Sequence, residues 1–421
     1  MKVCILGLGY IGLPTALMFA NHETEVHGVD VNPTIIKKLN QKELHIYEPG
    51  LIELLNQAIE TKLITFSTTP VHSDAFIISV PTPVTENKCA DLKFVVKAIE
   101  MILPFLKKGN LIVLESTVPP KTVVQTILPL LERTNLEVGK DLFVSYSPER
   151  VLPGNLINEI INNDRIIGGI NSESTQLAVN LYKRFVKGTI HETDSTTAEM
   201  VKLIENTYRD INIAFANELA QIGDTFNINI WHAIELANNH PRVNIHTPGP
   251  GVGGHCIAVD PWFIANEFPD HSDLIKLSRI KNESMPLYVV KTIKNLLETI
   301  QNPVITILGL SYKGNIDDTR ESPSLEVLSQ LKKENYKVKA YDPYVNLDLP
   351  EVCKELEDAV KDTDCILVLT NHDNFSQLDF EKISKIVRRK VIFDTRNVIN
   401  STNAEKFGFS YNLLGNAIQK N

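Results

Sequence analysis

Cysteine is scarce in this chain of 421 residues, which contains only five. An odd, sparse count disfavours the paired framework that stabilises disulfide-rich secreted proteins. Long apolar runs are also missing, since none approaches the ~20 residues that cross a bilayer. The first six residues run straight into a glycine turn, without the apolar segment and cleavage site of a signal peptide. Together these features predict a cytoplasmic protein.

Positive charge is in deficit. The 42 Lys and Arg residues are outnumbered by 51 Asp and Glu residues, which gives a formal net charge of -9. This balance provides no electrostatic footprint for nucleic acid or an anionic membrane surface, so an anionic ligand needs cations placed locally. His255 lies beside Cys256, but no second cysteine or histidine follows at metal-ligand spacing. We expect no binding of nucleic acid, membrane or metal.

Short apolar runs alternate with helix-length segments at both ends of the chain, a pattern that predicts parallel α/β sheets. The runs are 3–6, 25–29, 75–80, 111–115 and 142–145, and again 304–308, 338–341, 365–369 and 391–393. Between them, an amphipathic helix is expected from about Thr193 to Phe226, opened by a capping box of Thr196 and Glu199. The sequence therefore predicts an α/β protein with two Rossmann-like doubly wound domains, 1–190 and 301–421, joined by a helical core, 191–300. No residue-level repeat between the two α/β halves is evident.

A glycine-rich turn, Gly7-Leu8-Gly9-Tyr10-Ile11-Gly12, follows the first apolar run and precedes a helical segment. This context favours dinucleotide binding over an ordinary turn, because the glycines permit a tight bend, close approach of the pyrophosphate and close helix packing. Asp30 ends the next strand, where a carboxylate accepts hydrogen bonds from a ribose diol and repels a 2′-phosphate. The predicted cofactor is NAD. The loops 80–83 and 115–119 also follow strands and either line the cofactor crevice or are plain turns.

A second glycine-rich stretch, 248–254, leads to Cys256, and Asp260 lies one helical turn further on. If Cys256 opens a short helix, the helix dipole favours its thiolate and Asp260 lies on the same face, although Pro261 limits that helix. The alternative is a surface turn with an incidental cysteine. The neighbouring His255 is poorly placed to act as its base, because adjacent residues rarely form a nucleophile-base pair.

On the long helix, a polar stripe of Glu199, Lys202, Asn206 and Arg209 runs opposite Met200, Leu203 and Ile204. Lys202 and Asn206, one turn apart, can direct two donors toward a developing oxyanion. The alternative is a solvated helix face.

These motifs resemble the UDP-glucose/UDP-mannose (UDP-sugar) 6-dehydrogenase family over essentially the whole chain. The stretches that carry the resemblance are 7–12, Ser116-Thr117, Ser147-Pro148-Glu149-Arg150, 199–206, Gly253-Gly254-His255-Cys256 and Asp317-Asp318-Thr319-Arg320-Glu321-Ser322-Pro323. The resemblance implies oxidation of a sugar C6 hydroxyl to a carboxylate with two NAD, through a thiohemiacetal and a thioester on Cys256. A thiol suits this chemistry because it adds reversibly to aldehydes and leaves from acyl groups.

The resemblance also implies residue roles. It assigns catalysis to Cys256, Lys202, Asn206, Asp260, Glu149 and Thr117, and NAD binding to Gly7, Gly9, Tyr10, Ile11, Gly12, Asp30, Pro81, Thr82, Thr117 and Arg320. It assigns substrate binding to Glu149, Arg150, Lys202, Asn206, Arg242, His246, Gly253 and Lys313. It further implies a homodimer or higher homo-oligomer, in which Arg242 reaches a neighbouring active site.

Two departures from the UDP-glucose pattern bear on the substrate: Val259 stands where a lysine is common, and Pro153 where a second glutamate is common. Both resemble the branch that oxidises UDP-N-acetylhexosamines. The stretches 238–244 and 257–263 are most similar to enzymes acting on UDP-N-acetyl-D-mannosamine, with UDP-N-acetylglucosamine as the alternative substrate.

Other classes of function fit less well. Short-chain dehydrogenases use a Tyr-x-x-x-Lys pair, and no tyrosine here has a lysine four residues on. A one-step hydroxyacid dehydrogenase needs neither the cysteine loop nor a third domain. A non-catalytic nucleotide-sugar sensor shares the fold, but it has no need of Cys256, Lys202, Asn206 and Asp260 together.

Overall fold

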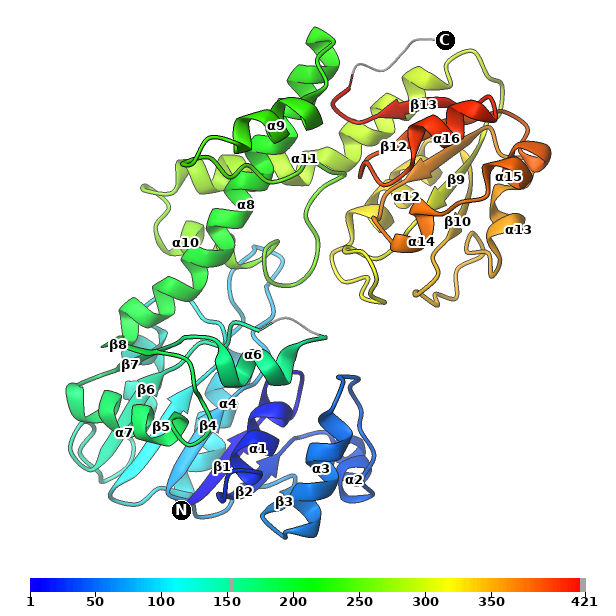
Figure 1. Cartoon of the computed structure of the whole chain (residues 1–421). Helices are drawn as coiled ribbons and strands as arrows, with labels where there is room; N and C mark the ends of the chain where they lie inside the picture. Colours follow the sequence, from blue (N-terminus) through cyan, green and yellow to red (C-terminus); the bar gives the residue numbers. More distant parts are fainter. Residues whose placement is uncertain (152–153, 417–421) are drawn as a thin grey trace. The chain divides into compact units, whose positions relative to one another are not determined.

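Two mainly parallel sheets organise the chain, one in each of the two units into which it divides (Figure 1). This computed structural model describes residues 1–151 and 154–416. The first unit is Met1–Glu205 with Asn266–Phe268, and the second is Asn206–Ala265 with Pro269–Asn421. The predicted α/β class with two doubly wound sheets is confirmed. Pro153, which contributed to the substrate prediction, lies outside the described residues.

The sheet of the first unit has eight strands in the order β3-β2-β1-β4-β5-β6-β7-β8. The first six are parallel and follow the strand order of dinucleotide-binding domains, whereas β7 runs antiparallel to β6. The strands are β1 Lys2–Leu6, β2 Glu25–Val29, β3 Ile64–Ser67, β4 Ala75–Ile78, β5 Asn110–Leu114, β6 Leu142–Tyr146, β7 Arg165–Gly169 and β8 Ile190–Asp194. Strand order reverses between β1 and β4, and the loops there include the glycine turn.

Helices cover both faces of this sheet, so its central strands are buried on both sides. Alternate residues of β1 enter two different cores: Val3 and Ile5 pack on one face, Cys4 and Leu6 on the other. The helices are α1 Gly12–Ala20, α2 Pro33–Asn40, α3 Leu51–Glu60, α4 Lys93–Ile102, α5 Leu128–Leu131, α6 Leu156–Asn162 and α7 Ser172–Tyr182, with a π-helix at Val123–Ile127.

The long helix α8, Ser195–Phe226, begins differently from the prediction. Asp194 caps it, because its carboxylate accepts from Thr197 N at 2.9 Å and from the Thr197 hydroxyl at 2.6 Å. The predicted capping box of Thr196 and Glu199 is therefore wrong. The Glu199 carboxylate instead accepts the amides of Lys121 (2.6 Å) and Val123 (2.8 Å), where the π-helix begins.

The second unit contains a five-stranded parallel sheet in the order β10-β9-β11-β12-β13, the other common doubly wound order. Its strands are β9 Val304–Leu308, β10 Lys337–Tyr341, β11 Cys365–Val368, β12 Val391–Asp394 and β13 Ser410–Leu413. Its further helices are α9 Ile230–Asn238, α10 Asp260–Glu267, α11 Asp273–Leu296, α12 Pro323–Lys333, α13 Leu356–Val360, α14 Asp373–Ser376, α15 Phe380–Ile386 and α16 Ser401–Lys406. The last two residues of α10, Asn266 and Glu267, belong to the first unit.

The two sheets share a short residue-level repeat that the sequence analysis did not detect. Leu6-Gly7-Leu8 after β1 corresponds to Leu308-Gly309-Leu310 after β9, with glycine φ values of 91° and 94°. In the first repeat Leu8 N donates to Asp30 at the end of β2 (3.0 Å), and in the second Leu310 N donates to Asp342 at the end of β10 (2.6 Å). Each half therefore closes its glycine turn on an aspartate of the next strand.

Among the described helices, none combines the length and apolarity that crossing a bilayer demands. Within the same residues, no group of three or more His, Cys, Asp and Glu side chains is arranged to hold a metal ion.

Candidate active site

The glycine turn after β1 has the form that a dinucleotide requires. A β-carbon on Gly12 would lie 1.8 Å from Gly7 O, so the helix α1 packs against the turn only because glycine stands there. A β-carbon on Gly9 would meet no atom within 4 Å, which leaves the backbone open to a phosphate. The residues present therefore fit a pyrophosphate at the N-terminus of α1.

The predicted ribose acceptor, Asp30, lies directly after β2 and beside this turn. Its two oxygens accept one backbone amide each, from Leu8 (3.0 Å) and Asn32 (2.9 Å). Since a carboxylate has about four acceptor positions, Asp30 keeps capacity for a ribose diol. Of the other predicted contacts in the turn, Tyr10 is exposed and Ile11 is the N-cap residue of α1.

The loops after β4 and β5 are joined to each other. Thr82 donates to Thr117 O (2.6 Å), and Ser116 donates to Val80 O (2.7 Å). The structure thus brings together Thr82 and Thr117, both predicted to bind the cofactor, at the carboxyl ends of neighbouring strands. Pro81 is exposed in the first of these loops.

Glu149 and Arg150, predicted at the substrate, follow β6 and are both engaged. One Glu149 oxygen accepts Arg150 N (2.8 Å), and the other pairs with the buried Arg165. The Arg150 guanidinium donates to Glu205 on α8 (2.7 Å) and to the Asp164 carbonyl. The Glu149 pairing with Arg165 was not anticipated from the sequence, because it joins the loop after β6 to a residue of β7, 16 positions further on.

Cys256 is exposed and lies in a turn that leads into α10, not at the start of that helix. Its carbonyl accepts the amides of Val259 (3.0 Å) and Asp260 (2.8 Å), and the helix begins at Asp260 because Pro261 is tolerated only in a first turn. The condition for stabilisation of the thiolate by a helix dipole, that Cys256 opens a helix, is therefore not met. Asp260 is nevertheless held one turn after Cys256, as predicted.

Asp260 pairs with Asn206 of α8, whose amide donates to the carboxylate at 2.6 Å. Asn206 is 7% exposed and Asp260 is 3% exposed, so this charge-assisted hydrogen bond is shielded from water. Two residues predicted as catalytic, 54 positions apart in the sequence, are thus in direct contact.

The glycine-rich stretch before Cys256 packs on the loop that follows β9. Gly254 N donates to Arg320 O (2.9 Å), and a β-carbon on Gly254 would lie 2.9 Å from the Tyr312 ring. A β-carbon on Gly253 would lie 2.6 Å from Tyr312 Cβ, so side chains are excluded at both positions. The Arg320 guanidinium is fixed by Asp318, with Nη2 to Oδ2 at 2.6 Å. These contacts place Arg320 and Gly253 on adjoining loops.

The remaining predicted residues are more isolated. Lys202 is half-buried on α8, and among the described residues its ammonium forms no ion pair; Lys313 and Arg242 are exposed in loops. Asn212 accepts His246 N (3.3 Å), while His246 Nε2 is buried and finds no acceptor or donor in the described part of the chain. The apolar face predicted opposite Lys202 is only partly correct, since Leu203 is buried but Ile204 is 51% exposed.

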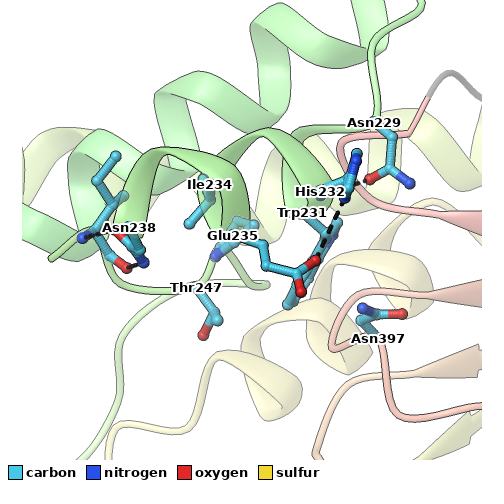
Figure 2. A pocket seen from close by; sticks show the side chains of 10 residues that line it. Asn229, Trp231, His232, Ile234, Glu235, Asn238, Thr247 and Asn397 are labelled. Atoms are coloured by element: carbon cyan, nitrogen blue, oxygen red, sulfur yellow. Dashed lines mark hydrogen bonds and ion pairs between the residues drawn. The ribbon is translucent and has the colours of Figure 1, made fainter. Parts of the chain in front are cut away.

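A cavity of about 550 Å³ lies in the second unit, between α9 and the segment that follows it (Figure 2). Its lining mixes polar and apolar side chains and includes His232 and Glu235, which contact each other at 3.4 Å. The full lining is Asn229, Trp231, His232, Ile234, Glu235, Asn238, Ile245, Thr247, Pro248 and Asn397. No predicted site residue is among them.

Arg396, which follows β12, was not predicted as a site residue from the sequence. Its Nε donates to Leu369 O (3.1 Å), and a β-carbon on Gly249 would lie 2.5 Å from its Nη1. Burial lowers the pKa of Arg396 to about 10, so the guanidinium remains cationic at neutral pH. Ligands of doubly wound sheets bind at the carboxyl ends of the strands. An arginine three positions after the end of the predicted strand 391–393 was the available signal.

Three consecutive segments of the chain match models of known protein families. The descriptions are the UDP-glucose/GDP-mannose dehydrogenase family NAD binding domain (residues 1–186), central domain (196–284) and UDP binding domain (306–401). The first of these matches the unit that carries the glycine turn and Asp30.

Individual relatives cover the whole chain. UDP-N-acetyl-D-mannosamine dehydrogenase from Methanococcus maripaludis strain C7 is 48% identical, over 99% of this chain and 97% of its own length. The structure of UDP-D-ManNAc dehydrogenase from Pyrococcus horikoshii is 40% identical with a TM-score of 0.93, covering 99% of both chains. The UDP-N-acetyl-mannosamine dehydrogenase from S. aureus is 45% identical with a TM-score of 0.90, again covering 99% of both.

Proposed function

The chain belongs to the UDP-glucose/GDP-mannose dehydrogenase family, and from this membership we propose that it oxidises the C6 hydroxyl of UDP-N-acetyl-D-mannosamine to a carboxylate. The substrate follows from full-length relatives whose names specify UDP-N-acetyl-D-mannosamine. The observation that carries the chemistry is the exposed Cys256 thiol, one turn before an Asp260 carboxylate held by Asn206 at 2.6 Å.

The reaction needs two oxidations and one hydrolysis. The C6 alcohol first loses its hydroxyl proton and a hydride from carbon and becomes an aldehyde. The Cys256 thiolate adds to this aldehyde, and protonation of the oxygen gives a thiohemiacetal. Oxidation of the thiohemiacetal gives a thioester, and water then breaks the carbon–sulfur bond to release the acid and the thiol. NAD, when bound, accepts the two electrons and one hydrogen that leave carbon at each oxidation. Two NADH and two protons therefore form per sugar.

The other predicted catalytic residues act on charge and protons. Lys202 and Asn206 stabilise the oxyanion that forms whenever the carbonyl carbon is attacked. Asp260 transfers the hydroxyl proton, and Asn206 fixes its carboxylate. Glu149 accepts the proton of the attacking water, and Thr117 lies beside that water. Lys202 is half-buried and has no ion pair among the described residues, which suits the stabilisation of an oxyanion.

Ligand binding follows the same assignments. The glycine turn, Asp30 and the joined loops at Thr82 and Thr117 hold NAD, with Tyr10, Ile11, Pro81 and Arg320 as further contacts. Arg150, Arg242, His246, Gly253 and Lys313 contact the nucleotide sugar, together with Glu149, Lys202 and Asn206. Arg396 adds a cation for the pyrophosphate, which local positive charge must neutralise in a protein of net charge -9.

A homodimer fits the surface of α8. Tyr208, Phe215 and Ile222 are spaced seven residues apart and are 54%, 49% and 43% exposed, and Phe226 is 71% exposed. A regularly spaced apolar stripe on one helix face is typical of helix association. A second copy of the chain covers this stripe in our proposal, and the exposed Arg242 then reaches the neighbouring active site.

The domain division 1–190, 191–300 and 301–421 is supported by the three family matches, which fall inside these limits. A cytoplasmic location is supported by the five cysteines, all of them in the described part of the chain and none in a disulfide, since a reducing compartment keeps thiols reduced.

The test is the stoichiometry of NADH formation with purified protein. UDP-N-acetyl-D-mannosamine should yield two NADH per sugar and a uronic acid, and Cys256→Ala should form no acid, because the second oxidation needs the covalent adduct. One NADH per sugar would overturn the two-step reaction. Faster turnover of UDP-N-acetylglucosamine would reassign the substrate, and no NADH with either sugar would favour a nucleotide-sugar sensor.

A further inference from the structure

A buried cluster of charged side chains lies behind Glu149 in the first unit. Arg165 of β7 donates through Nη1 to Ser147 (2.9 Å) and, at 3.5 Å, to Glu115, which follows β5. Its Nη2 pairs with Glu149. The guanidinium also stacks on Tyr182 of α7, with Cζ 4.3 Å from the ring centroid. Arg165 thus bridges two carboxylates, Glu115 after β5 and Glu149 in the loop after β6.

The cluster contains more negative than positive charge. The side chains of Arg165, Glu115 and Glu149 are 4%, 0% and 9% exposed, so full ionisation leaves one net negative charge away from water. Such a charge is costly unless it is neutralised. Two carboxylates that share one cation therefore favour a state in which one of them keeps a proton.

Glu115 is the carboxyl that keeps the proton. One of its oxygens accepts the Tyr182 hydroxyl at 2.6 Å, but the other is buried and has no hydrogen-bond partner within the described residues. Glu149 has a donor on each oxygen, from Arg150 N and Arg165. Burial raises the pKa of Glu115 to about 7, and the groups that act on it are Arg165 from β7, Glu149 after β6 and Tyr182 from α7.

We propose that Arg165 is the positioning residue for Glu149, and that ionisation of Glu115 decides whether Arg165 serves both carboxylates or Glu149 alone. This inference rests on the proposed role of Glu149 in accepting the proton of the attacking water. When Glu115 is neutral, the whole charge of Arg165 acts on Glu149 and makes it a weaker base. When Glu115 loses its proton to solvent, Arg165 is shared, the added negative charge raises the basicity of Glu149, and hydrolysis of the thioester accelerates.

The inference is tested by the pH dependence of kcat for acid formation in the full-length protein, from about pH 5 to about pH 9. Wild type should show a rise near pH 7, the value to which burial raises the pKa of Glu115. Glu115→Gln should lose this rise, because the side chain stays neutral. Tyr182→Phe should move the rise to higher pH, because Glu115 loses a donor that favours its charged form.

Arg165→Lys separates positioning from charge. Lysine keeps the charge but lacks the fork that reaches Ser147 and Glu149 together, so kcat should fall by about a hundredfold while KM changes little. Circular dichroism tests whether each variant is folded. If Glu115→Gln is not folded, the pH profile of Tyr182→Phe tests the inference instead. A Glu115→Gln profile equal to that of wild type, or an unmoved midpoint in Tyr182→Phe, overturns the inference. The NADH stoichiometry of the wild type is measured separately. Failure of the proposed function can therefore be distinguished from failure of this inference.

Discussion

Removing the side-chain amide of Asn206 tests the catalytic roles proposed for this residue, which include holding Asp260. Asn206→Ala deletes a 2.6 Å hydrogen bond between side chains that are 7% and 3% exposed. A buried hydrogen bond to a charged group contributes about 1.5–3 kcal/mol. If that energy is expressed in the transition state, kcat falls by roughly ten- to 150-fold, because each 1.4 kcal/mol is a factor of ten.

The assay compares kcat, KM and thermal stability of Asn206→Ala with those of a matched control. Asn282→Ala removes a comparable bond, from Asn282 to the buried Asp210 at 2.8 Å, outside the predicted catalytic set. Both variants should lose stability, but only Asn206→Ala should lose kcat in excess of any change in KM. Equal kcat in the two variants would falsify the idea that Asn206 acts through Asp260 in catalysis.

Three further results are expected. Gly12→Ala should abolish NAD binding in a fluorescence titration, because the new β-carbon would lie 1.8 Å from Gly7 O; retained affinity would mean that the turn can shift. Burial raises the pKa of Glu199 from 4.5 to about 7, so the folded state holds a proton that the unfolded state releases. This contribution to the free energy of unfolding, about 3 kcal/mol, is present below pH 4.5 and lost as pH rises through 7. Denaturation of Glu199→Gln should show a weaker pH dependence, and an identical slope would refute the assignment. Mixing inactive Arg242→Ala and Cys256→Ala subunits should restore activity if Arg242 reaches a neighbouring site, whereas no recovery would place both residues in one subunit's site.

Most of the strands that the sequence predicted are buried along nearly their whole length. The predicted runs 3–6 and 304–308 correspond to β1 and β9, because strands covered on both faces are continuous apolar runs. The strand β8 was missed because its residues, Ile190–Asp194, are mostly exposed and polar. The strand β7 was missed because it carries Arg165 and two glycines, which are unusual in a strand and reflect the buried cluster and close backbone contacts.

For the site, local spacing was informative and distant pairing was not. The glycine turn and the interval from Cys256 to Asp260 depend on a few consecutive residues, so their pattern is visible in the chain. The pairing of Glu199 with the amides of Lys121 and Val123 spans more than 70 positions and depends on how α8 packs. A carboxylate on a polar helix stripe gives no indication that it is buried, which is why Glu199 was assigned to a cap.

The matched glycine turns also bear on how one chain keeps two nucleotides apart. Asp342 has the same relation to its turn as Asp30, but it is saturated: its oxygens receive the amides of Leu310, Ser311, Tyr344 and Val345 and contact His372 at 3.0 Å. Five neighbours exceed the roughly four acceptor positions of a carboxylate, so no ribose diol can be bound there. A dinucleotide that met the second turn would find the backbone bend without the sugar acceptor. The equivalent aspartates of the two halves thus differ in how many further hydrogen bonds each can accept.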